Sequence, residues 1–401
     1  MTSLNTQFDL IRQSATVAMA DRVVNLRAQG HKIIGLQTGD PDFATPPAVI
    51  DVALRAMQDG VTHYGPSRGT LELRKAIARK IANVSGVQYS SESEILVTHG
   101  SIHAYYCAIQ SILNPGDDVL IPDPSWATHA NMITMLHGHA IRVPAPAENG
   151  FIPPLEAWER AITPQTRAII LNWPSNPTGA IAPREYMLEL AKLATHHDLW
   201  LIGDEVYDHL VYDGIEHTSL AALPNMKGRV LLLNSLSKTY AMTGWRVGYL
   251  AAPEKVIEHA LKASQNSITC VTPFIQKAAA FALSDPGVQQ AAADMCTAYA
   301  ARRELVLRLA REHGPSPVKI TPPDGAFYFF MDVRTLGMSS LEICERLLDE
   351  TSVALVPGAA FGEQGEGFVR MTIAASETDI AAGFKAILAW ADRQLSVNSY
   401  Q

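Results

Sequence analysis

A lysine that follows a short apolar run is the first residue of this chain that could do covalent chemistry. Lys238 ends the segment Asn-Ser-Leu-Ser-Lys, and Thr-Tyr-Ala-Met-Thr-Gly-Trp-Arg follows it. An S-x-x-K pair also occurs in penicillin-binding enzymes, in which Ser235 would be the nucleophile, but their companion S-D-N and K-T-G segments are absent from this sequence. An isolated lysine is most often a solvated surface residue. The neighbouring motifs must therefore decide whether Lys238 is an amine nucleophile.

Two further segments place polar side chains directly after predicted strands. Asp204-Glu-Val-Tyr follows the apolar run Leu199–Gly203, and Asn172-Trp-Pro-Ser-Asn176-Pro-Thr-Gly follows Ala168–Leu171. Open α/β sheets bind ligands at the carboxyl ends of their strands. There Asp204 could keep a pyridine nitrogen protonated, and Asn176, fixed between two prolines, could donate to a ring hydroxyl. Taken alone, Asp204 is also compatible with a loop or helix cap and the Asn172 segment with a simple turn.

Taken in order, these segments resemble the pyridoxal 5′-phosphate (PLP)-dependent aminotransferases of fold type I, class I/II. The resemblance rests on N-x-P-x-N-P-T-G, D-E-x-Y, S-x-S-K followed by G-W-R-x-G, and a late F-x-R, and it extends from about Gly39 to Arg370. It implies that Lys238 holds PLP as a Schiff base and then moves a proton between the substrate and the cofactor. The implied reaction transfers the amino group of an L-α-amino acid to a 2-oxo acid, pyruvate or 2-oxoglutarate, by ping-pong half-reactions.

The resemblance also implies which residues surround the cofactor. Asp204 would pair with the pyridinium nitrogen, and Tyr207 and Asn176 would hydrogen-bond the ring oxygen. The phosphate is expected where Gly100 opens a helix, because free backbone N–H groups and the helix dipole attract an anion. Its implied ligands are Ser101, Ile102, Ser235 and Arg246. Tyr64 would reach the phosphate of the other subunit, which implies a homodimer with shared active sites; a packed tyrosine is the alternative.

The substrate is expected to meet four of the matched residues. Trp126 would stack on the cofactor ring, and Arg370 would clamp the α-carboxylate as a planar fork, with help from the Gly39 backbone and from Asn176. An arginine within a run of strand residues is costly to bury without a partner, which itself favours a ligand role.

The side chain of the substrate is less well specified. Ile102 and Trp173 stand where the family often has polar residues, which favours neutral or aromatic amino acids. Arg12 instead favours dicarboxylic amino acids, because some bacterial aspartate-type relatives carry a cation near this position that faces the distal carboxylate of the substrate. Alternatively, Arg12 is a solvated charge on a helix.

Alternating apolar runs and stretches of 3.6 periodicity position these motifs in a doubly wound α/β fold. Strands are predicted at Ile95–Val97, Val119–Ile121, Ala168–Leu171, Leu199–Gly203, Val230–Asn234 and Val247–Ala251, with helices at Ser101–Leu113, Trp126–His137, Pro183–His196 and Pro253–Ser264. The resemblance implies a mostly parallel, seven-stranded sheet. We expect a large PLP-binding domain over 46–284 and a smaller α+β domain from 1–45 and 285–401, with a strand at Ile33–Leu36, a helix over Val288–His313, strands near Phe327–Asp332 and Phe368–Thr372, and a terminal helix from Glu377.

Composition restricts the possible partners. A net charge of −8 disfavours nucleic-acid and anionic-membrane binding, and no run reaches the roughly 20 apolar residues of a membrane span. Met1–Asp9 lacks the pattern of a signal peptide. The four cysteines have no C-x-x-C spacing, which argues against a metal site and favours reduced thiols in the cytoplasm: Cys107, Cys270, Cys296 and Cys344.

Three other functions compete with that of an aminotransferase. A C–S β-lyase on the same fold begins from the same carbanion, so the sequence barely separates it from an aminotransferase. A non-catalytic PLP-binding regulatory module would carry an additional DNA-binding domain, for which we see no spare segment. A nicotinamide enzyme would need G-x-G-x-x-G after its first strand, and none is present.

Overall fold

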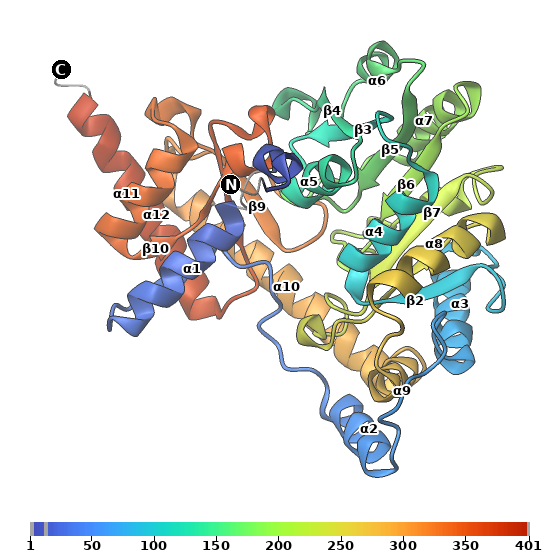
Figure 1. Cartoon of the computed structure of the whole chain (residues 1–401). Coiled ribbons are helices and arrows are strands. Elements are labelled where there is room, and N and C mark those ends of the chain that lie inside the picture. The colour runs from blue at the N-terminus through green and yellow to red at the C-terminus, as the bar shows by residue number, and fades with distance from the viewer. Residues whose placement is uncertain (1–3, 12–14, 399–401) are drawn as a thin grey trace.

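A seven-stranded sheet forms the centre of the larger part of the molecule (Figure 1). The computed structural model describes residues 4–11 and 15–398. Six strands of the sheet are parallel, and β8 runs antiparallel to both of its neighbours. In spatial order the strands are β2 (Ile95–Thr98), β8 (Gly248–Ala251), β7 (Val230–Ser235), β6 (Trp200–Asp204), β5 (Thr166–Asn172), β3 (Asp118–Asp123) and β4 (His139–Pro144).

Helices cover both faces of this sheet because its central strands are apolar on both sides. Leu201 and Leu232 belong to the core on one face, whereas Ile202 and Leu233 belong to the core on the other. The first face packs against α3 (Leu71–Ser85), α6 (Leu155–Ala161), α7 (Arg184–His196) and α9 (Pro273–Ala282), and the second against α4 (Gly100–Ile112), α5 (Ala127–Met135) and α8 (Glu254–Ser267). Another helix, α2 (Pro47–Gln58), packs on α9 at the lower end of the view in Figure 1.

Both ends of the chain build a second, smaller unit with its own core, which includes Phe327, Phe384 and Trp390. Its two small sheets are β1 (Ile34–Gly35) parallel to β10 (Val353–Ala354), and β11 (Val356–Pro357), β12 (Phe368–Thr372) and β9 (Tyr328–Asp332) in antiparallel order. Its helices are α1 (Ala15–Ala28), α10 (Pro286–His313), α11 (Ser340–Thr351) and α12 (Glu377–Asn398). The predicted fold class is confirmed, and the boundaries at 46 and 285 stay a prediction.

Short 3₁₀ helices connect several of these elements. They are η1 (Thr6–Leu10), η2 (Ala147–Asn149), η3 (Leu220–Ala222), η4 (Thr243–Trp245), η5 (Arg334–Leu336), η6 (Gly358–Phe361) and η7 (Glu363–Gly365). The sequence reading locates every strand of the large sheet except β4, an edge strand whose residues are mostly half-buried or exposed, so that no apolar run marks it.

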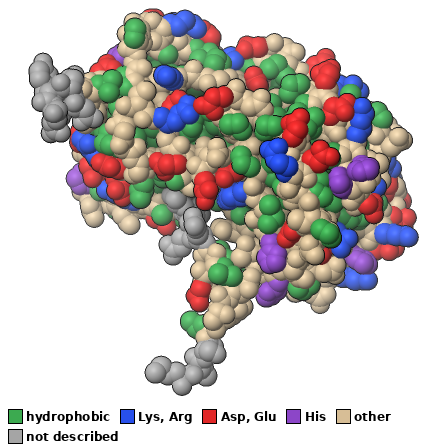
Figure 2. Space-filling view, turned by 90° about the horizontal axis from the view of Figure 1, so that it is seen from above, with side chains coloured by type: hydrophobic (Ala, Val, Ile, Leu, Met, Phe, Trp, Pro, Cys, Tyr) green, Lys and Arg blue, Asp and Glu red, His purple; other side chains and the backbone are tan. Residues whose placement is uncertain are grey.

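The described surface carries charges of both signs. Acidic and basic side chains are interspersed over the face shown in Figure 2. Among the helices of residues 4–11 and 15–398, none is both long and apolar enough to cross a membrane.

Candidate active site

The carboxyl ends of the parallel strands bring the sequence motifs together. Strands β5, β6 and β7 end at Asn172, Asp204 and Ser235, and Asn172 is the register partner of Asp204. A cavity of about 290 Å³ lies at this edge, between the large sheet and the smaller unit. Its lining residues are Gly39, Asp40, Ser101, Ile102, Trp126, Asn172, Asn176, Asp204, Val206, Tyr207, Ser235, Ser237, Lys238, Thr243, Arg246, Tyr328 and Arg370.

Lys238 lies in the loop that follows β7, and its ammonium group donates a hydrogen bond to the main-chain oxygen of Gly39. Burial lowers the pKa of Lys238 to about 8; the Asp40 carboxylate opposes this shift, and Arg370 and Arg246 add to it. An amine with this pKa is partly unprotonated near neutral pH, which is the form that attacks a carbonyl carbon.

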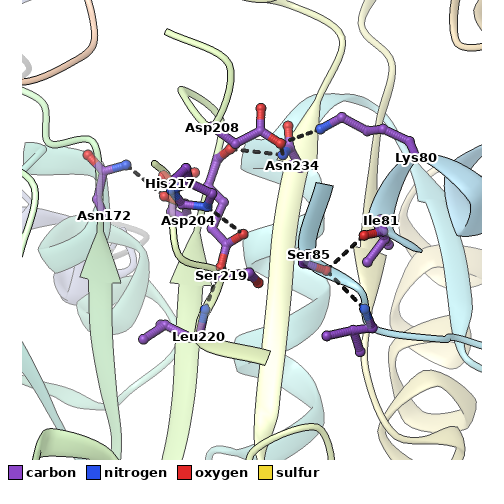
Figure 3. A network of polar contacts seen from close by, with 12 residues as sticks. Lys80, Ile81, Ser85, Asn172, Asp204, Asp208, His217, Ser219, Leu220 and Asn234 are labelled. Carbon is purple, nitrogen blue, oxygen red and sulfur yellow. Dashed lines mark hydrogen bonds and ion pairs between the residues drawn. The ribbon is translucent and has the colours of Figure 1, made fainter. Parts of the chain in front are cut away.

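Asp204 presents an unsatisfied carboxylate oxygen to the cavity. Its Oδ2 lies 3.4 Å from Nε2 of His129, and Asn172 Nδ2 donates to its main-chain oxygen at 2.9 Å (Figure 3). Its Oδ1 is buried and has no hydrogen-bond partner among the described residues. Because a buried acceptor without a donor is destabilising, this oxygen fits a ligand that brings an N–H group, as a protonated pyridine ring does.

The N-terminus of α4 and Arg246 form a cradle of positive character. Helix α4 begins at Gly100, whose φ of 73° lies in the left-handed region that favours glycine. A Cβ at this position would lie 2.7 Å from the Arg246 guanidinium, so only glycine leaves the space open. Ser101 and Ile102 place the free N–H groups of the first helical turn there, and Ser235 lines the same wall. The arrangement fits a phosphate group.

Arg370 extends from β12 and is 2% exposed. It donates to the side-chain oxygen of Asn176 and to the main-chain oxygen of Gln37, each at 2.8 Å, while its Nε has no partner. Within the described ranges it forms no ion pair with an acidic side chain, and burial lowers its pKa. A buried guanidinium without a counterion fits a ligand carboxylate.

Two tyrosines line the same cavity. The hydroxyl groups of Tyr207 and Tyr328 lie 2.9 Å apart, and burial raises the pKa of Tyr207, so Tyr207 remains a hydrogen-bond donor at neutral pH. A Cβ at Gly39 would lie 2.3 Å from the Tyr328 hydroxyl. Position 39 must therefore be glycine for its backbone to approach the cavity.

The structure gathers nearly all the predicted site residues in one cavity, and Tyr64 is the exception. It is 88% exposed and does not line the cavity of its own chain. Arg12 lies outside the described residues. The sequence reading missed His129, whose ring meets the Trp126 ring edge-on at 5.4 Å, and the lining residues Asp40, Asn172, Val206, Ser237, Thr243 and Tyr328. Asn172 could have been found, because it directly follows the predicted strand Ala168–Leu171.

Comparison with known proteins decides the family. The family model "Aminotransferase class I and II" matches residues 31–387. This chain is a member of the class I and II aminotransferases. It is 41% identical to aromatic-amino-acid aminotransferase 2 of Thermococcus litoralis, over 86% of this chain and 89% of the relative. It is 40% identical to the arginine–pyruvate transaminase of Pseudomonas aeruginosa, over 86% of each chain.

A solved structure supports the same assignment. The aspartate aminotransferase of Thermus thermophilus with maleate superposes with a TM-score of 0.92 at 37% identity, over 97% of this chain and 100% of that one. The aminotransferase described here is thus a PLP-dependent transferase. The open oxygen of Asp204 and the Gly100–Arg246 cradle fit the pyridine nitrogen and the phosphate of PLP. The named relatives act on aromatic amino acids, arginine and aspartate, so their names do not specify one donor.

Proposed function

We propose that this aminotransferase takes its amino group from a neutral or aromatic L-amino acid and passes it to pyruvate or 2-oxoglutarate by ping-pong half-reactions. The observation that carries the proposal is the number of cations in the cavity. Lys238, Arg246 and Arg370 are the basic residues that line it within the described chain. Lys238 would be used by the cofactor carbonyl as an amine, and Arg246 and Arg370 would be used by the phosphate and the substrate α-carboxylate. None of these three basic residues is then left for a distal carboxylate. Ile102 and Trp126 give the remaining wall an apolar surface.

The proposed roles of the residues follow from their places in the cavity. Bound PLP supplies a conjugated ring that accepts electrons from the substrate Cα. Lys238 would hold PLP covalently and then carry the proton, and Asp204 would keep the ring nitrogen protonated. Tyr207 and Asn176 would donate to the ring oxygen. The phosphate would bind Ser101, Ile102, Ser235 and Arg246, Trp126 would stack on the ring, and Arg370, Asn176 and Gly39 would hold the substrate carboxylate.

The first experiment is a spectral titration of the PLP-loaded protein with single amino acids in the absence of any oxo acid. We expect phenylalanine and other neutral donors to replace the visible absorbance of PLP by the ultraviolet absorbance of pyridoxamine phosphate. Lys238→Ala should abolish the change, and retained activity would contradict the proposed role. If the visible band persists while ammonia and pyruvate accumulate from a β-substituted donor, the C–S β-lyase is the better description.

Specificity is tested by one added cation. Ile102→Lys places an ammonium group at the cavity wall while keeping the main-chain N–H, so the ratio of kcat/KM for aspartate over phenylalanine should rise roughly tenfold or more, the effect of one charge-assisted hydrogen bond. Ile102→Met is the control of similar shape and should leave this ratio unchanged. A wild-type ratio that already favours aspartate would contradict the neutral-donor proposal and direct attention to Arg12.

We also propose a homodimer with shared sites in the cytoplasm. Tyr64 is exposed in a single chain, as expected if it reaches the phosphate of a partner, and α2 exposes Ile50, Leu54 and Met57. When the inactive Lys238→Ala and Tyr64→Ala variants are refolded together, activity should return. Each hybrid dimer then has one intact site, with Lys238 from one chain and Tyr64 from the other. If Tyr64 acts in its own chain, no hybrid site is intact and no activity returns. The four cysteines are free thiols, as expected in the reducing cytoplasm, and so support the proposed location.

A further inference from the structure

A second set of polar groups lies next to Asp204, at the turn over residues 205–208 that follows β6 (Figure 3). Asp208 follows Tyr207 directly and forms a buried ion pair with Lys80 of α3. The Asp208 Oδ2 atom also accepts a hydrogen bond of 2.9 Å from Nδ2 of Asn234. None of Lys80, Asp208 and Asn234 is among the residues that line the active-site cavity. Their side chains therefore act on the site only through other residues.

Asn234 connects this ion pair to both ends of the turn. Its Nδ2 donates a second hydrogen bond, of 2.8 Å, to the main-chain oxygen of Glu205. Its Oδ1 accepts from the N–H of Ser235 at 2.7 Å. One amide side chain thus joins the first and last residues of the segment 205–208 to the end of β7, from which the loop to Lys238 begins.

The carboxylate of Glu205 is fixed from a different direction. It accepts hydrogen bonds from the Ser219 hydroxyl at 2.9 Å and from the N–H of Leu220 at 3.0 Å, and His217 Nε2 lies 3.1 Å away. Asn172 in addition holds the main-chain oxygen of Asp204. Side chains from β5 and β7 and the segment 217–220 therefore all hold this part of the chain in place.

Both members of the ion pair are charged at neutral pH. Burial works against the charge of Lys80, but the Asp208 carboxylate, together with Tyr249 and Tyr240, outweighs it, and the pKa of Lys80 is raised. Burial likewise opposes the charge of Asp208, and Lys80 lowers the pKa of Asp208 below its usual value. Buried ion pairs are often no more stabilising than apolar residues of similar volume. What such a pair supplies is a fixed geometry.

We infer that the Lys80–Asp208 ion pair, acting through Asn234, is a positioning device that holds Asp204 and Tyr207 at the cofactor ring. The inference rests on the proposed roles of these two residues. Lys80 and Asp208 would be positioning residues, because neither touches the cavity. Loss of the pair would let the turn move, so that the Tyr207 hydroxyl donates less well to the ring oxygen.

The test measures the cofactor itself rather than turnover. We expect Lys80→Met to raise the dissociation constant of PLP, titrated into apoprotein by fluorescence, by about fivefold, the effect of one weakened neutral hydrogen bond. The pH midpoint of the visible PLP band should rise, because a ring oxygen that loses a donor becomes more basic. Lys80→Arg keeps the ion pair and should restore both values toward those of the wild type.

Two further variants separate positioning from general destabilisation. Asp118→Asn removes a buried carboxylate at the amino end of β3, where it accepts a hydrogen bond from the Thr163 hydroxyl at 2.8 Å. This variant should lower stability and leave the pH midpoint of the PLP band unchanged. If Lys80→Met does not fold, the double variant Lys80→Met/Asp208→Leu replaces the pair by apolar groups and should fold yet keep the altered midpoint.

The possible outcomes distinguish this inference from the proposed function. A wild-type midpoint and PLP affinity in Lys80→Met, or an equal shift in Asp118→Asn, would overturn the positioning role. If Asp204→Ala shifts the PLP spectrum while Lys80→Met does not, only the positioning inference fails. If Asp204→Ala also has no effect, the assignment of the ring site fails first.

Discussion

Arg370 donates a hydrogen bond of 2.8 Å to the side-chain oxygen of Asn176, and this contact determines which way the Asn176 amide faces. With its oxygen occupied by the guanidinium, the amide has its NH₂ group left to donate into the cavity. The Asn176 side chain thereby joins two proposed functions. Its oxygen holds Arg370, which would bind the substrate carboxylate, and its NH₂ group would bind the ring oxygen.

Replacing this amide by a carboxylate should give Arg370 an internal counterion. In Asn176→Asp the new carboxylate competes with the substrate for the guanidinium, so we expect KM for phenylalanine to rise at least tenfold, as for loss of a charge-assisted hydrogen bond. The substrate without a carboxylate, 2-phenylethylamine, serves as the control in single-turnover measurements. An equal loss of affinity for both compounds would show that Arg370 does not read the carboxylate.

The phosphate cradle predicts a matched pair of glycine variants. Gly100→Ala places a methyl group 2.7 Å from the Arg246 guanidinium at a left-handed φ of 73°. We expect the PLP dissociation constant to rise by at least tenfold. Gly60→Ala provides the control, because its φ is 80° but a methyl group there meets nothing within 4 Å. It should cost about 1 kcal/mol of stability with unchanged PLP affinity; reduced affinity in both variants would refute the cradle.

The lowered pKa of Lys238 predicts the pH dependence of PLP capture. Only the neutral amine attacks, so the rate of covalent PLP binding to apoprotein should rise with pH around a midpoint near 8 rather than the 10.5 of an ordinary lysine. Because the Asp40 carboxylate raises the pKa of Lys238, Asp40→Asn should move this midpoint to lower pH. Stopped-flow absorbance measures both, and an Asp40→Asn midpoint above that of the wild type would contradict the electrostatic account.

Asp204 is expected to act on the chemical step. In Asp204→Asn the amide cannot stabilise a positive charge on the ring nitrogen, so single-turnover conversion of phenylalanine should slow by at least a hundredfold, within the range of a lost catalytic electrostatic contact. Asp123→Asn changes another buried carboxylate, at the end of β3, and should slow the step far less. An unchanged rate in Asp204→Asn would mean that the role is misassigned.

The buried His217 predicts how stability varies with pH. Burial lowers the pKa of His217, but the Glu205 and Asp208 carboxylates together outweigh this and raise the pKa above its ordinary value. A group whose folded-state pKa is raised contributes stability that is complete below its unfolded pKa and is lost as pH rises through the folded value. His217→Gln should therefore lower the Tm of the apoprotein more at pH 6 than at pH 9. The reverse order would contradict the charged pair.

The sequence predicts the parts of the site that follow apolar strands, because a buried parallel strand is recognisable and its carboxyl end is where ligands bind. It does not reveal His129 or Tyr328, whose places within a helix and a strand look like ordinary packing positions. Nor does it reveal the Lys80–Asp208 pair, whose members lie 128 residues apart. Edge strand β4 was missed because half-exposed residues carry no apolar run. The roles of the site residues and the domain boundaries stay predictions.

The hydrogen bond from Arg370 to the main-chain oxygen of Gln37 joins residues 333 positions apart. Strand β1 likewise has its register partner at Val353. During synthesis, residues 34–37 are thus made long before the strands that hold them in place. The large sheet can begin to fold while the chain is still growing, whereas Val23 and Leu36, buried in the folded protein, remain exposed until the core residues between Tyr299 and Ala391 have been made. The apolar side chains of these two residues therefore stay in contact with water throughout that interval.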